Sequence, residues 1–472
     1  MLDAAPLYQQ VAEAIGHLIA SGTLRSGQRV PSVRRLSQQR RVSVSTVLQA
    51  YKQLEDAGLI EARPQSGYYV KRRALPAPEP ELSHPPQRPL AVEVNALADL
   101  VLSAGHDPEV ITFGIAWPRA DNFPLERIRR VLSARARRSR DAIGRYGGPP
   151  GSEEFRRAIA RRALEWGCHL DYRNIVTTMG CMEAINLALR AVTQPGDTVA
   201  LESPTYYGFL QILESLRLRA LEIPTHPRAG ISLDALEVAL RAHDVKAAVV
   251  MPTLSNPIGA TMTDRAKQRL VALLAARRVP LIEDQGYAEL HSGRGTPRAA
   301  KSYDRSGNVM LCGSFTKTLC PGLKAGWIEP GRWRDRVRML KFVASGGHNE
   351  LVELTLAELL ESGGYERSLR QLRRYNTLQV EHGRRVIAES FPRGTRATQP
   401  AGGYILWVEL PRRCDSIVLF EELLERRISI APGPMFSATG RYRNCLRIAV
   451  GQPWSERTEK ALREVGRLAS GL

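Results

Sequence analysis

The residue in this chain best placed for covalent chemistry is a lysine just after a predicted strand. Lys317 follows the apolar run 308–313, whose composition and terminal glycine predict a buried strand. Hydroxyl side chains flank it at Ser314, Thr316 and Thr318. A lysine amine that is desolvated enough to lose its proton can form a Schiff base, and nearby hydroxyls can hold an anionic group. An isolated lysine is more often a solvated surface residue, so the interpretation depends on what accompanies it.

Two further polar residues stand at the ends of predicted strands upstream. Asp284 follows the apolar run 279–283. A carboxylate there can pair with a protonated pyridine nitrogen, which keeps the ring an electron sink. Asn256 follows the run 247–252, where its amide can hydrogen-bond a ring phenolate oxygen. Both positions predict contacts to one planar heterocycle.

A phosphate site and a stacking aromatic complete the pattern. The stretch 175–185 predicts a strand, a glycine turn and the start of a helix. Backbone N–H groups at such a helix start form an anion site that fits a phosphate. Tyr206, in the segment between this turn and Asn256, is an aromatic that can stack on a ring.

These residues occur in the order found in a known family. Residues from about 96 to 472 resemble a pyridoxal-phosphate enzyme of the class I/II aminotransferase family, which has fold type I. The resemblance implies that Lys317 forms an internal aldimine with pyridoxal 5'-phosphate and that Asp284 pairs with the pyridine nitrogen. It implies the other roles as well: Asn256 and Tyr287 bond the ring oxygen, Tyr206 stacks on the ring, Gly180, Cys181 and Ser314 hold the phosphate, Arg447 clamps a substrate carboxylate, and Tyr146 reaches the phosphate of a neighbouring subunit.

Two positions depart from the pattern of that family. Lys324 stands where the family usually has a phosphate-binding arginine, so a point charge replaces a bidentate fork. Cys181 stands where a serine or threonine usually donates a hydroxyl, and a thiol is a weaker donor. We expect both changes to loosen the grip on the phosphate without removing the chemistry.

Composition limits the class of protein that can hold these residues. The 472 residues allow two or three domains, and 43% hydrophobic with 24% charged residues is ordinary for a globular chain. The net charge of +19 favours a polyanionic partner. No apolar run approaches the length of a membrane span and residues 1–10 hold no apolar core of a secretion signal, so we expect a cytoplasmic protein without membrane contact. Six cysteines without C-x-x-C or metal-ligand spacing predict reduced thiols and no metal site.

The first 72 residues predict a separate DNA-reading domain. Apolar residues at helical spacing predict helices near 7–21, 32–41 and 44–56, and the β-like runs 59–62 and 68–70 predict a hairpin. Three helices and a hairpin indicate a winged helix-turn-helix, and this stretch closely resembles the GntR type. A recognition helix contacts bases through its first turn while a neighbouring helix start grips phosphate. The candidate DNA contacts are Arg34 and Arg35 opening helix two, Ser43, Ser45 and Thr46 at the start of helix three, and Ser66 and Gly67 at the wing tip.

The following segments carry a linker and a basic stretch. Residues 73–95 hold six prolines between positions 76 and 89, which predicts an extended, semi-stiff linker that lets the DNA reader reach away. Residues 127–140 hold seven arginines, either a solvated helix face or an auxiliary surface for the DNA backbone. Residues 1–72 contribute ten Lys and Arg against five Asp and Glu, a surplus of 5, so 14 of the 19 net charges lie beyond them.

The remainder of the chain predicts an α/β domain. After residue 173, β-like runs at 199–201, 247–251, 279–283 and 308–312 alternate with amphipathic helices. This alternation predicts a doubly wound sheet with the cofactor at the carboxyl ends of its strands. Residues from about 335 to 472 are expected to form a smaller α+β subdomain. The chain is thus predicted to hold a winged helix-turn-helix, residues 1–72, and an aminotransferase-like α/β domain, residues 96–472.

The combination of domains resembles the MocR-type regulators. That resemblance implies a bacterial transcription factor that acts as a homodimer, binds operator DNA and senses a small amino compound through its cofactor-bearing domain. One alternative is a metabolic aminotransferase with an accessory DNA-binding domain. Another is a cofactor-free fold used only for dimerisation, against which the Lys317 and Asp284 pair argues.

Overall fold

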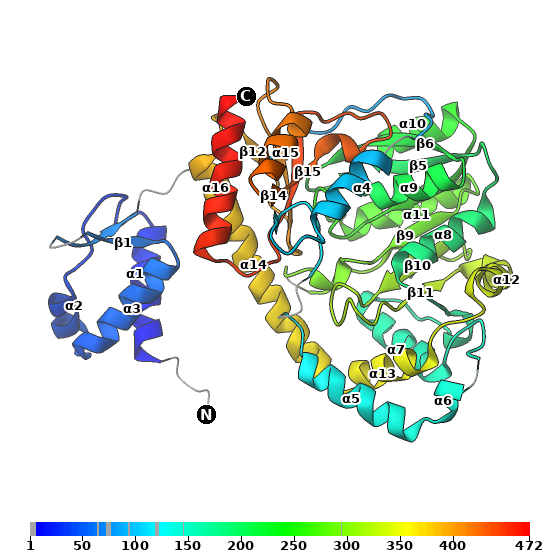
Figure 1. Ribbon diagram of the computed structural model, residues 1–472, viewed down its shortest axis with the longest axis horizontal. Coiled ribbons are helices and arrows are strands. Elements are labelled where there is room, and N and C mark those ends of the chain that lie inside the picture. The colour runs from blue at the N-terminus through cyan, green and yellow to red at the C-terminus, as the bar shows by residue number, and fades with distance from the viewer. Residues whose placement is uncertain are drawn as a thin grey trace. The chain divides into compact units, whose positions relative to one another are not determined.

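The computed structural model describes residues 6–63, 66–71, 77–92, 95–118, 122–144, 146–293 and 295–472. The chain divides into two compact units between Pro76 and Ala77 (Figure 1). The smaller unit is a winged helix-turn-helix and the larger has the fold type I aminotransferase architecture. Both parts of the predicted fold class are confirmed.

The smaller unit consists of three helices and a two-stranded hairpin. Its elements are α1 (Leu7–Ala20), α2 (Val33–Arg40), α3 (Val44–Asp56), β1 (Ile60–Arg63) and β2 (Gly67–Val70). Serine hydroxyls cap two of the helices, because Ser32 accepts from the Arg35 N–H and Ser43 from the Thr46 N–H. Helix α3 packs against α1 and buries Val47, Ala50, Tyr51 and Leu54, and the Tyr51 hydroxyl donates to the Pro31 carbonyl at 2.6 Å. These contacts fix α2 and α3 with their first turns capped.

The larger unit is built on an eight-stranded sheet of order β4-β11-β10-β9-β8-β5-β6-β7. Neighbouring strands from β10 to β6 run parallel, whereas β11 and β7 are antiparallel to their neighbours. The strands are β4 (Val176–Thr178), β5 (Thr198–Ser203), β6 (Arg219–His226), β7 (Gly230–Ile231), β8 (Val245–Val250), β9 (Leu281–Asp284), β10 (Val309–Ser314) and β11 (Gly326–Glu329).

Alternate residues of the strands bury against helices on the two faces of this sheet. Val199 and Leu201 of β5 pack in one core cluster with α8 and α9, whereas Ala200 between them packs in another with α10 and α11. Because side chains alternate across a strand, a strand that is apolar throughout needs a helix layer on each face. The helices of this unit include α5 (Leu125–Arg138), α6 (Asp141–Gly144), α7 (Glu153–Ala163), α8 (Cys181–Val192), α9 (Tyr207–Ser215), α10 (Leu233–Ala242), α11 (Asp264–Ala276), α12 (Arg334–Ser345) and α13 (Glu350–Glu361). No helix within the described ranges is both long and apolar enough to cross a bilayer.

A second, four-stranded sheet of order β12-β13-β16-β15 forms the smaller subdomain of this unit. Its elements are α14 (Gly364–Ser390), β12 (Arg396–Ala397), β13 (Ile405–Glu409), α15 (Ser416–Glu425), β14 (Ile428–Ser429), β15 (Ala431–Pro432), β16 (Cys445–Ala449) and α16 (Glu456–Gly471). Residues far upstream join it, because β3 (Ile111–Thr112) pairs with β14 and α4 (Asn95–Ala104) packs into the same core.

The subdomain boundary therefore differs from the predicted start near residue 335. Helix α13 contributes Leu356, Ala357 and Leu359 to the core of the large sheet. The first half of α14 joins the same core, and its second half contributes Val380, Val386 and Ile387 to the core of the small sheet. The small subdomain therefore begins within α14, and it includes residues 95–113. An amphipathic pattern predicts that a helix packs, but it does not tell which of two neighbouring cores the helix joins.

The Pro-rich segment also differs from the predicted free linker. Its described part, residues 77–92, lies along the larger unit as a strap. Leu90 and Ala220 exchange both backbone hydrogen bonds at 2.9 Å, and the Thr225 N–H donates to the Ser83 hydroxyl at 2.8 Å. The segment is extended, as its composition predicts, but sheet-edge backbone groups hold it in place. Residues 72–76 and 93–94 of the predicted boundary and linker lie outside the described residues.

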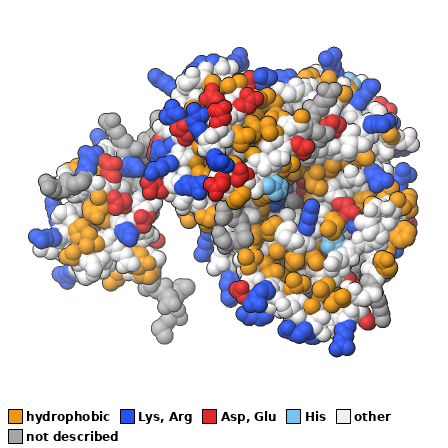
Figure 2. All heavy atoms as spheres, viewed as in Figure 1, with side chains coloured by type: hydrophobic (Ala, Val, Ile, Leu, Met, Phe, Trp, Pro, Cys, Tyr) orange, Lys and Arg blue, Asp and Glu red, His pale blue; other side chains and the backbone are white. Residues whose placement is uncertain are grey.

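The arginine-rich segment forms α5, and Figure 2 shows basic side chains gathered along the edge of the larger unit where this helix lies. Some of them are internally paired. Arg135 contacts Glu358 and Glu154, and Arg129 pairs with Glu126. Arg137 and Arg140 are exposed. Whether this face contacts DNA stays a prediction.

Candidate cofactor site and DNA-contact residues

The predicted site residues come together at the carboxyl edge of the large sheet. Asp284 is the last residue of β9, Lys317 follows β10, and Asn256 lies in the loop after β8. Gly180 lies between β4 and α8 at the same edge. Because the carboxyl ends of parallel strands meet at one edge, residues up to 137 positions apart in the sequence share one site.

The Lys317 amine lies in a protected environment. Its Nζ donates to the Ala116 carbonyl at 2.7 Å and lies 5.6 Å from the centre of the Tyr287 ring. Burial, and then the positive charge of Arg447, lower the pKa of Lys317 to about 8, while Asp284 acts in the opposite direction. An amine with that pKa is partly neutral near physiological pH, as a nucleophile requires.

Two donors bond one oxygen of the Asp284 carboxylate. Its Oδ1 accepts from the Gly286 N–H at 2.6 Å and from the Cys181 thiol at 3.1 Å. Burial raises the pKa of Asp284, and these hydrogen bonds together with Lys317 lower it in part. The Cys181 side chain is thus engaged with Asp284, so for a phosphate only its backbone N–H remains. The sequence did not anticipate this contact, because it joins residues from two different strand ends.

The turn from β4 into α8 is the position at which the sequence predicts an anion site. Gly180 has φ of +85° and no side chain caps the helix after it. A Cβ at Gly180 would lie 4.0 Å from both the Thr316 hydroxyl oxygen and the Lys324 side chain. Lys324 is exposed beside this turn, and Ser314 is partly buried at the end of β10. Thr316 was not among the residues predicted to hold the phosphate. Its position among the hydroxyls that flank Lys317 in the sequence could have indicated it.

Arg447 is almost completely buried and reaches the site from the other subdomain. It lies in β16, where its Nη1 donates to Asn256 Oδ1 at 3.2 Å and its Nη2 to the Gly114 carbonyl at 2.5 Å. Its Nε is buried and has no hydrogen-bond partner among the described residues. A buried guanidinium with a donor to spare favours an incoming anion.

A short N-terminal segment covers the site. The Ala116 carbonyl accepts from Lys317 and also from the Tyr404 hydroxyl, at 2.9 Å. The Ala116 carbonyl thus accepts a hydrogen bond from Lys317, and the Gly114 carbonyl accepts one from Arg447. Tyr206 is partly buried, with its ring 4.7 Å from that of Tyr207.

One buried acid was missed by the sequence reasoning. Glu202, near the end of β5, accepts from the Met251 N–H at 2.9 Å, and its second oxygen has no partner among the described residues. Burial raises its pKa to about 8, with the Asp284 charge contributing. A glutamate within an otherwise largely apolar strand is the sequence feature that could have indicated this buried acid.

Tyr146 is fully exposed at 104% of its reference surface. It makes no contact with the site of its own chain in the described structure, so its predicted role in a neighbouring subunit stays a prediction. No cluster of three or more potential metal-ligating side chains occurs within the described ranges.

The candidate DNA contacts lie on the smaller unit. Arg34 and Arg35 are exposed on the first turn of α2, and Ser45 is exposed on the first turn of α3. The Ser43 hydroxyl contacts those of Ser45 and Thr46 at 2.8 and 2.7 Å, so this serine serves mainly as a helix cap.

At the wing, the Ser66 hydroxyl contacts that of Tyr69 at 2.6 Å. Gly67 has φ of +103°, a conformation that favours glycine. Residues 64 and 65 of the wing tip, among them Gln65, lie outside the described residues.

Family comparisons agree with both units. The model described as "Aminotransferase class I and II" matches residues 108–465, and "Bacterial regulatory proteins, gntR family" matches residues 7–70. The chain belongs to the aminotransferase class I and II family. It joins that domain to a gntR-family helix-turn-helix, which is the MocR-type architecture, and the predicted resemblance is confirmed.

Relatives share the whole arrangement. Two Escherichia coli (strain K12) proteins named as uncharacterized HTH-type transcriptional regulators are similar from end to end. YdcR is 39% identical over 461 residues, 98% of each chain, and YjiR is 36% identical over 460 residues, 97% of this chain and 98% of its own. Among solved structures, LysN, the alpha-aminoadipate aminotransferase from Thermus thermophilus, aligns with a TM-score of 0.74 and 25% identity, covering 80% of this chain and 95% of its own.

The residues of this MocR-type protein fit pyridoxal 5'-phosphate. The uncapped helix start at Gly180, the buried Asp284 carboxylate, the low-pKa amine of Lys317 and the unpartnered Nε of Arg447 match an anion, a pyridinium, an aldehyde and a carboxylate in turn. Of these groups, the Arg447 Nε is a buried donor that has no partner among the described residues and so most needs a complement. The fit therefore supports pyridoxal phosphate as the cofactor of this site.

The pKa of Lys317 makes a prediction about cofactor capture. Apo-protein mixed with pyridoxal phosphate should develop visible absorbance at a rate that rises with pH around a midpoint of about 8, because only the neutral amine reacts. Arg447→Gln should move the midpoint upward, since it removes a positive charge that lowers the pKa, and Asp284→Asn should move it downward. Lys317→Ala is the control and should give no such absorbance. A midpoint near that of free lysine would contradict this assignment.

A second prediction separates phosphate contacts from base contacts in the reader. Arg34→Ala should weaken binding to every DNA sequence and reduce the slope of log K against log salt by about one unit. Thr46→Ala should instead change sequence preference. Fluorescence anisotropy with operator and random duplexes measures both. Lys52→Ala, a charge-matched change in the second half of α3, should lower the slope less; an unchanged slope for Arg34→Ala would mean that α2 does not face DNA.

Proposed function

We propose that this protein is a DNA-binding transcriptional regulator that senses a small amino compound through pyridoxal phosphate. The observation that carries the proposal is one chain that joins a gntR-family reader to a site in which Lys317, Asp284 and Arg447 lie together. The regulator names of the two Escherichia coli relatives support the first part of it. The fit of the site residues to the cofactor supports the second.

The site residues have distinct tasks in this proposal. Bound pyridoxal phosphate supplies an electron-sink ring and an aldehyde that exchanges amines. Asp284 orients the ring through its nitrogen, and the Gly180 turn with Ser314, Thr316 and Lys324 holds the phosphate. Arg447 gives up the Gly114 carbonyl and binds the carboxylate of the effector, while Lys317 leaves the Ala116 carbonyl and takes up or releases a proton at Nζ. The effector is therefore an amino compound with a carboxylate.

A homodimer is part of the proposal. Large apolar side chains lie exposed near the candidate phosphate turn and on α12, namely Met179, Met182, Met339, Phe342 and Val343. A second copy of the chain would cover such a surface, and the exposed Tyr146 would reach the partner's phosphate. Two readers on one dimer would then bind two half-sites of an operator.

The runner-up is a metabolic aminotransferase with an accessory DNA-binding domain. The complete set of reactive groups, with an amine whose pKa is near 8, favours it as a second candidate. The relative from Thermus thermophilus named 2-aminoadipate transaminase is 27% identical over 385 residues and lines up with 81% of this chain. The two functions differ in whether effector and DNA influence each other's binding.

Thermodynamic reciprocity tests this difference. The effector should change the operator affinity by about 5- to 150-fold, the usual range of allosteric coupling. Operator DNA must then change the effector affinity by the same factor. Titrating amino compounds by visible absorbance, with and without operator duplex, measures the second factor, and anisotropy measures the first. Equal affinities for every compound that shifts the spectrum would leave the enzyme as the better function.

The strap of residues 77–92 gives the coupling a physical route. It is the first described segment after the DNA reader in the sequence, and it contacts both subdomains of the larger unit. The Glu79 carboxylate accepts from Arg228 of the large subdomain and from the Gln399 N–H of the small one, the latter at 3.0 Å. The Ala397 N–H donates to the Pro78 carbonyl at 2.8 Å. Any rotation between subdomains must therefore stretch or release the strap.

The strap also touches a loop of the cofactor site. The Ser83 hydroxyl donates to the Ser203 carbonyl. Ser203 lies three residues before Tyr206, and its hydroxyl contacts that of Tyr442 at 2.7 Å. A ligand that shifts Tyr206 would therefore also move Ser203 and, through its hydrogen bond with Ser83, the strap.

The strap yields a prediction that separates coupling from binding. Glu79→Gln combined with Ser83→Ala should reduce the mutual effect of effector and operator by about tenfold, the equivalent of one lost charge-assisted hydrogen bond. The affinity for each ligand alone should change little, because neither residue touches ligand. Glu81→Gln is the comparison variant: it also removes a contact of the strap with the small subdomain, but the pair of Glu81 with Arg396 is largely exposed and solvent weakens it, so the coupling should fall much less. Full coupling in the double variant would place the route elsewhere.

A further inference from the structure

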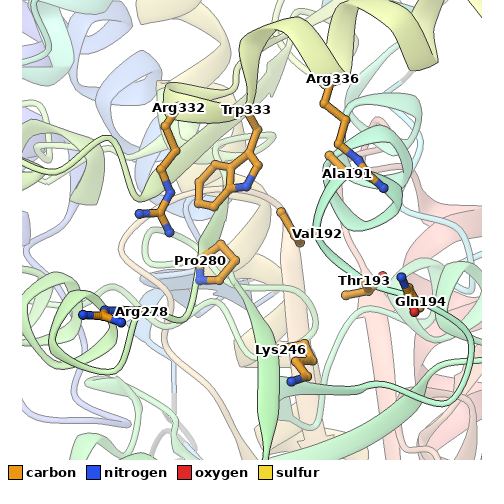
Figure 3. Close-up of a pocket in the computed structure, with 10 residues that line it drawn as sticks. All are labelled: Ala191, Val192, Thr193, Gln194, Lys246, Arg278, Pro280, Arg332, Trp333 and Arg336. Atoms are coloured by element: carbon orange, nitrogen blue, oxygen red, sulfur yellow. The ribbon is translucent and has the colours of Figure 1, made fainter.

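A basic pocket opens at the edge of the large sheet opposite the cofactor site. It has a volume of about 400 Å³ and lies at the amino-terminal ends of β8 and β9, beside the first turn of α12. Its walls include Lys246, Arg278, Arg332 and Arg336, and its floor includes Pro280. Figure 3 shows the Arg332 and Trp333 side chains extending toward this floor.

The pocket is separate from the cofactor site. Pro280 precedes β9 and Asp284 ends it, so the two sites are about 13 Å apart along this strand at a rise of about 3.3 Å per residue. The sheet and its helix layers fill the space between. A ligand in this pocket cannot contact the cofactor residues directly.

Positive charge in the pocket exceeds the negative charge that balances it. Lys246 pairs with Asp244 at 2.8 Å, and Asp197 is a second acid that acts on it. The side chains of Arg278 and Arg336 have no hydrogen bond or ion pair with any described residue. Two guanidinium groups beside the same cavity are therefore without a counter-ion from the described part of the chain.

Local structure holds these charges in place. Arg278 has a left-handed backbone with φ of +55° at the turn between α11 and β9. Arg332 donates to Asn308 Oδ1 at 2.9 Å and lies 4.4 Å over the Trp333 ring, which orients both side chains. Like charges gathered around one concave site focus a positive potential. An anion bound in the pocket would supply the counter-charge that Arg278 and Arg336 lack.

We propose that this pocket binds a small ligand with at least two phosphate charges, such as a diphosphate or a nucleoside diphosphate. Planar guanidinium groups bind phosphate oxygens in pairs, which suits Arg278 and Arg336. A cavity of this volume lies within the range of small-molecule sites. Duplex DNA, the other phosphate source, is a convex rod, so a hollow with recessed walls favours the small ligand. The site would give the regulator a second input, independent of the amino effector.

Calorimetric titration of the pyridoxal phosphate-loaded protein with inorganic pyrophosphate and with ADP tests the proposal. Loading fills the cofactor phosphate site, so any binding occurs elsewhere. We expect saturable binding that weakens with salt, and a loss of at least about tenfold in affinity for Arg278→Gln with Arg336→Gln, since each guanidinium forms charge-assisted hydrogen bonds.

A control pair removes the same charge from exposed arginines outside the pocket, Arg265→Gln with Arg393→Gln. It should bind both probes as the unmodified protein does. Equal losses in the two pairs would show a diffuse charge effect and overturn the proposal, as would absence of binding. If the pocket pair keeps pyrophosphate affinity but loses affinity for a random DNA duplex, the pocket is a DNA contact and the proposal is wrong. Unchanged visible absorbance in each variant shows that the fold and the cofactor site are intact.

Discussion

The structure of the larger unit depends on burying opposite charges together at the carboxyl edge of its sheet. Asp284 and Arg447 are at most 6% exposed. Arg447 lowers the pKa of the Lys317 amine, and Asp284 raises it. An isolated charge in such a place costs several kcal/mol, so each group persists only because the others and nearby backbone groups compensate it. This compensation requires that the ends of three strands in the large sheet and strand β16 of the second sheet keep their relative positions.

This balance also joins the two subdomains. Arg447 belongs to the small sheet, yet its partners Asn256 and Gly114 lie in the loop after β8 and in an N-terminal segment. The site therefore exists only while the subdomains are together. N-terminal residues cross the same junction twice, as the strap at 77–92 and as the cover at 113–118. A change in the hydrogen bonds of Arg447 or Lys317 acts on the segment that continues from the DNA reader.

Local features of the sequence predicted many elements closely. The predicted helix from Val44 to Asp56 has the same bounds in the structure, and Ser32 caps α2 as expected. The predicted strand 308–312 overlaps β10 at Val309–Ser314. Helix periodicity, capping hydroxyls and apolar runs are local features of the sequence. They therefore predict elements without knowledge of the tertiary contacts. The strand-end positions of Lys317, Asp284 and Asn256 followed from the same signals together with the family order.

Contacts between distant segments were not predictable in this way. A Pro-rich run has no periodicity, so its composition indicated an extended chain but not the sheet edge at Ala220 and Thr225 that holds it. The Cys181 thiol on Asp284, the second oxygen of Glu202 and the cover over Lys317 depend on which strand ends become neighbours. The amino-acid sequence alone determined the two domain types and the kinds of reactive group in the site. Tertiary structure alone decided which groups face each other and how buried they are, because pKa and pairing depend on surroundings assembled from the whole chain.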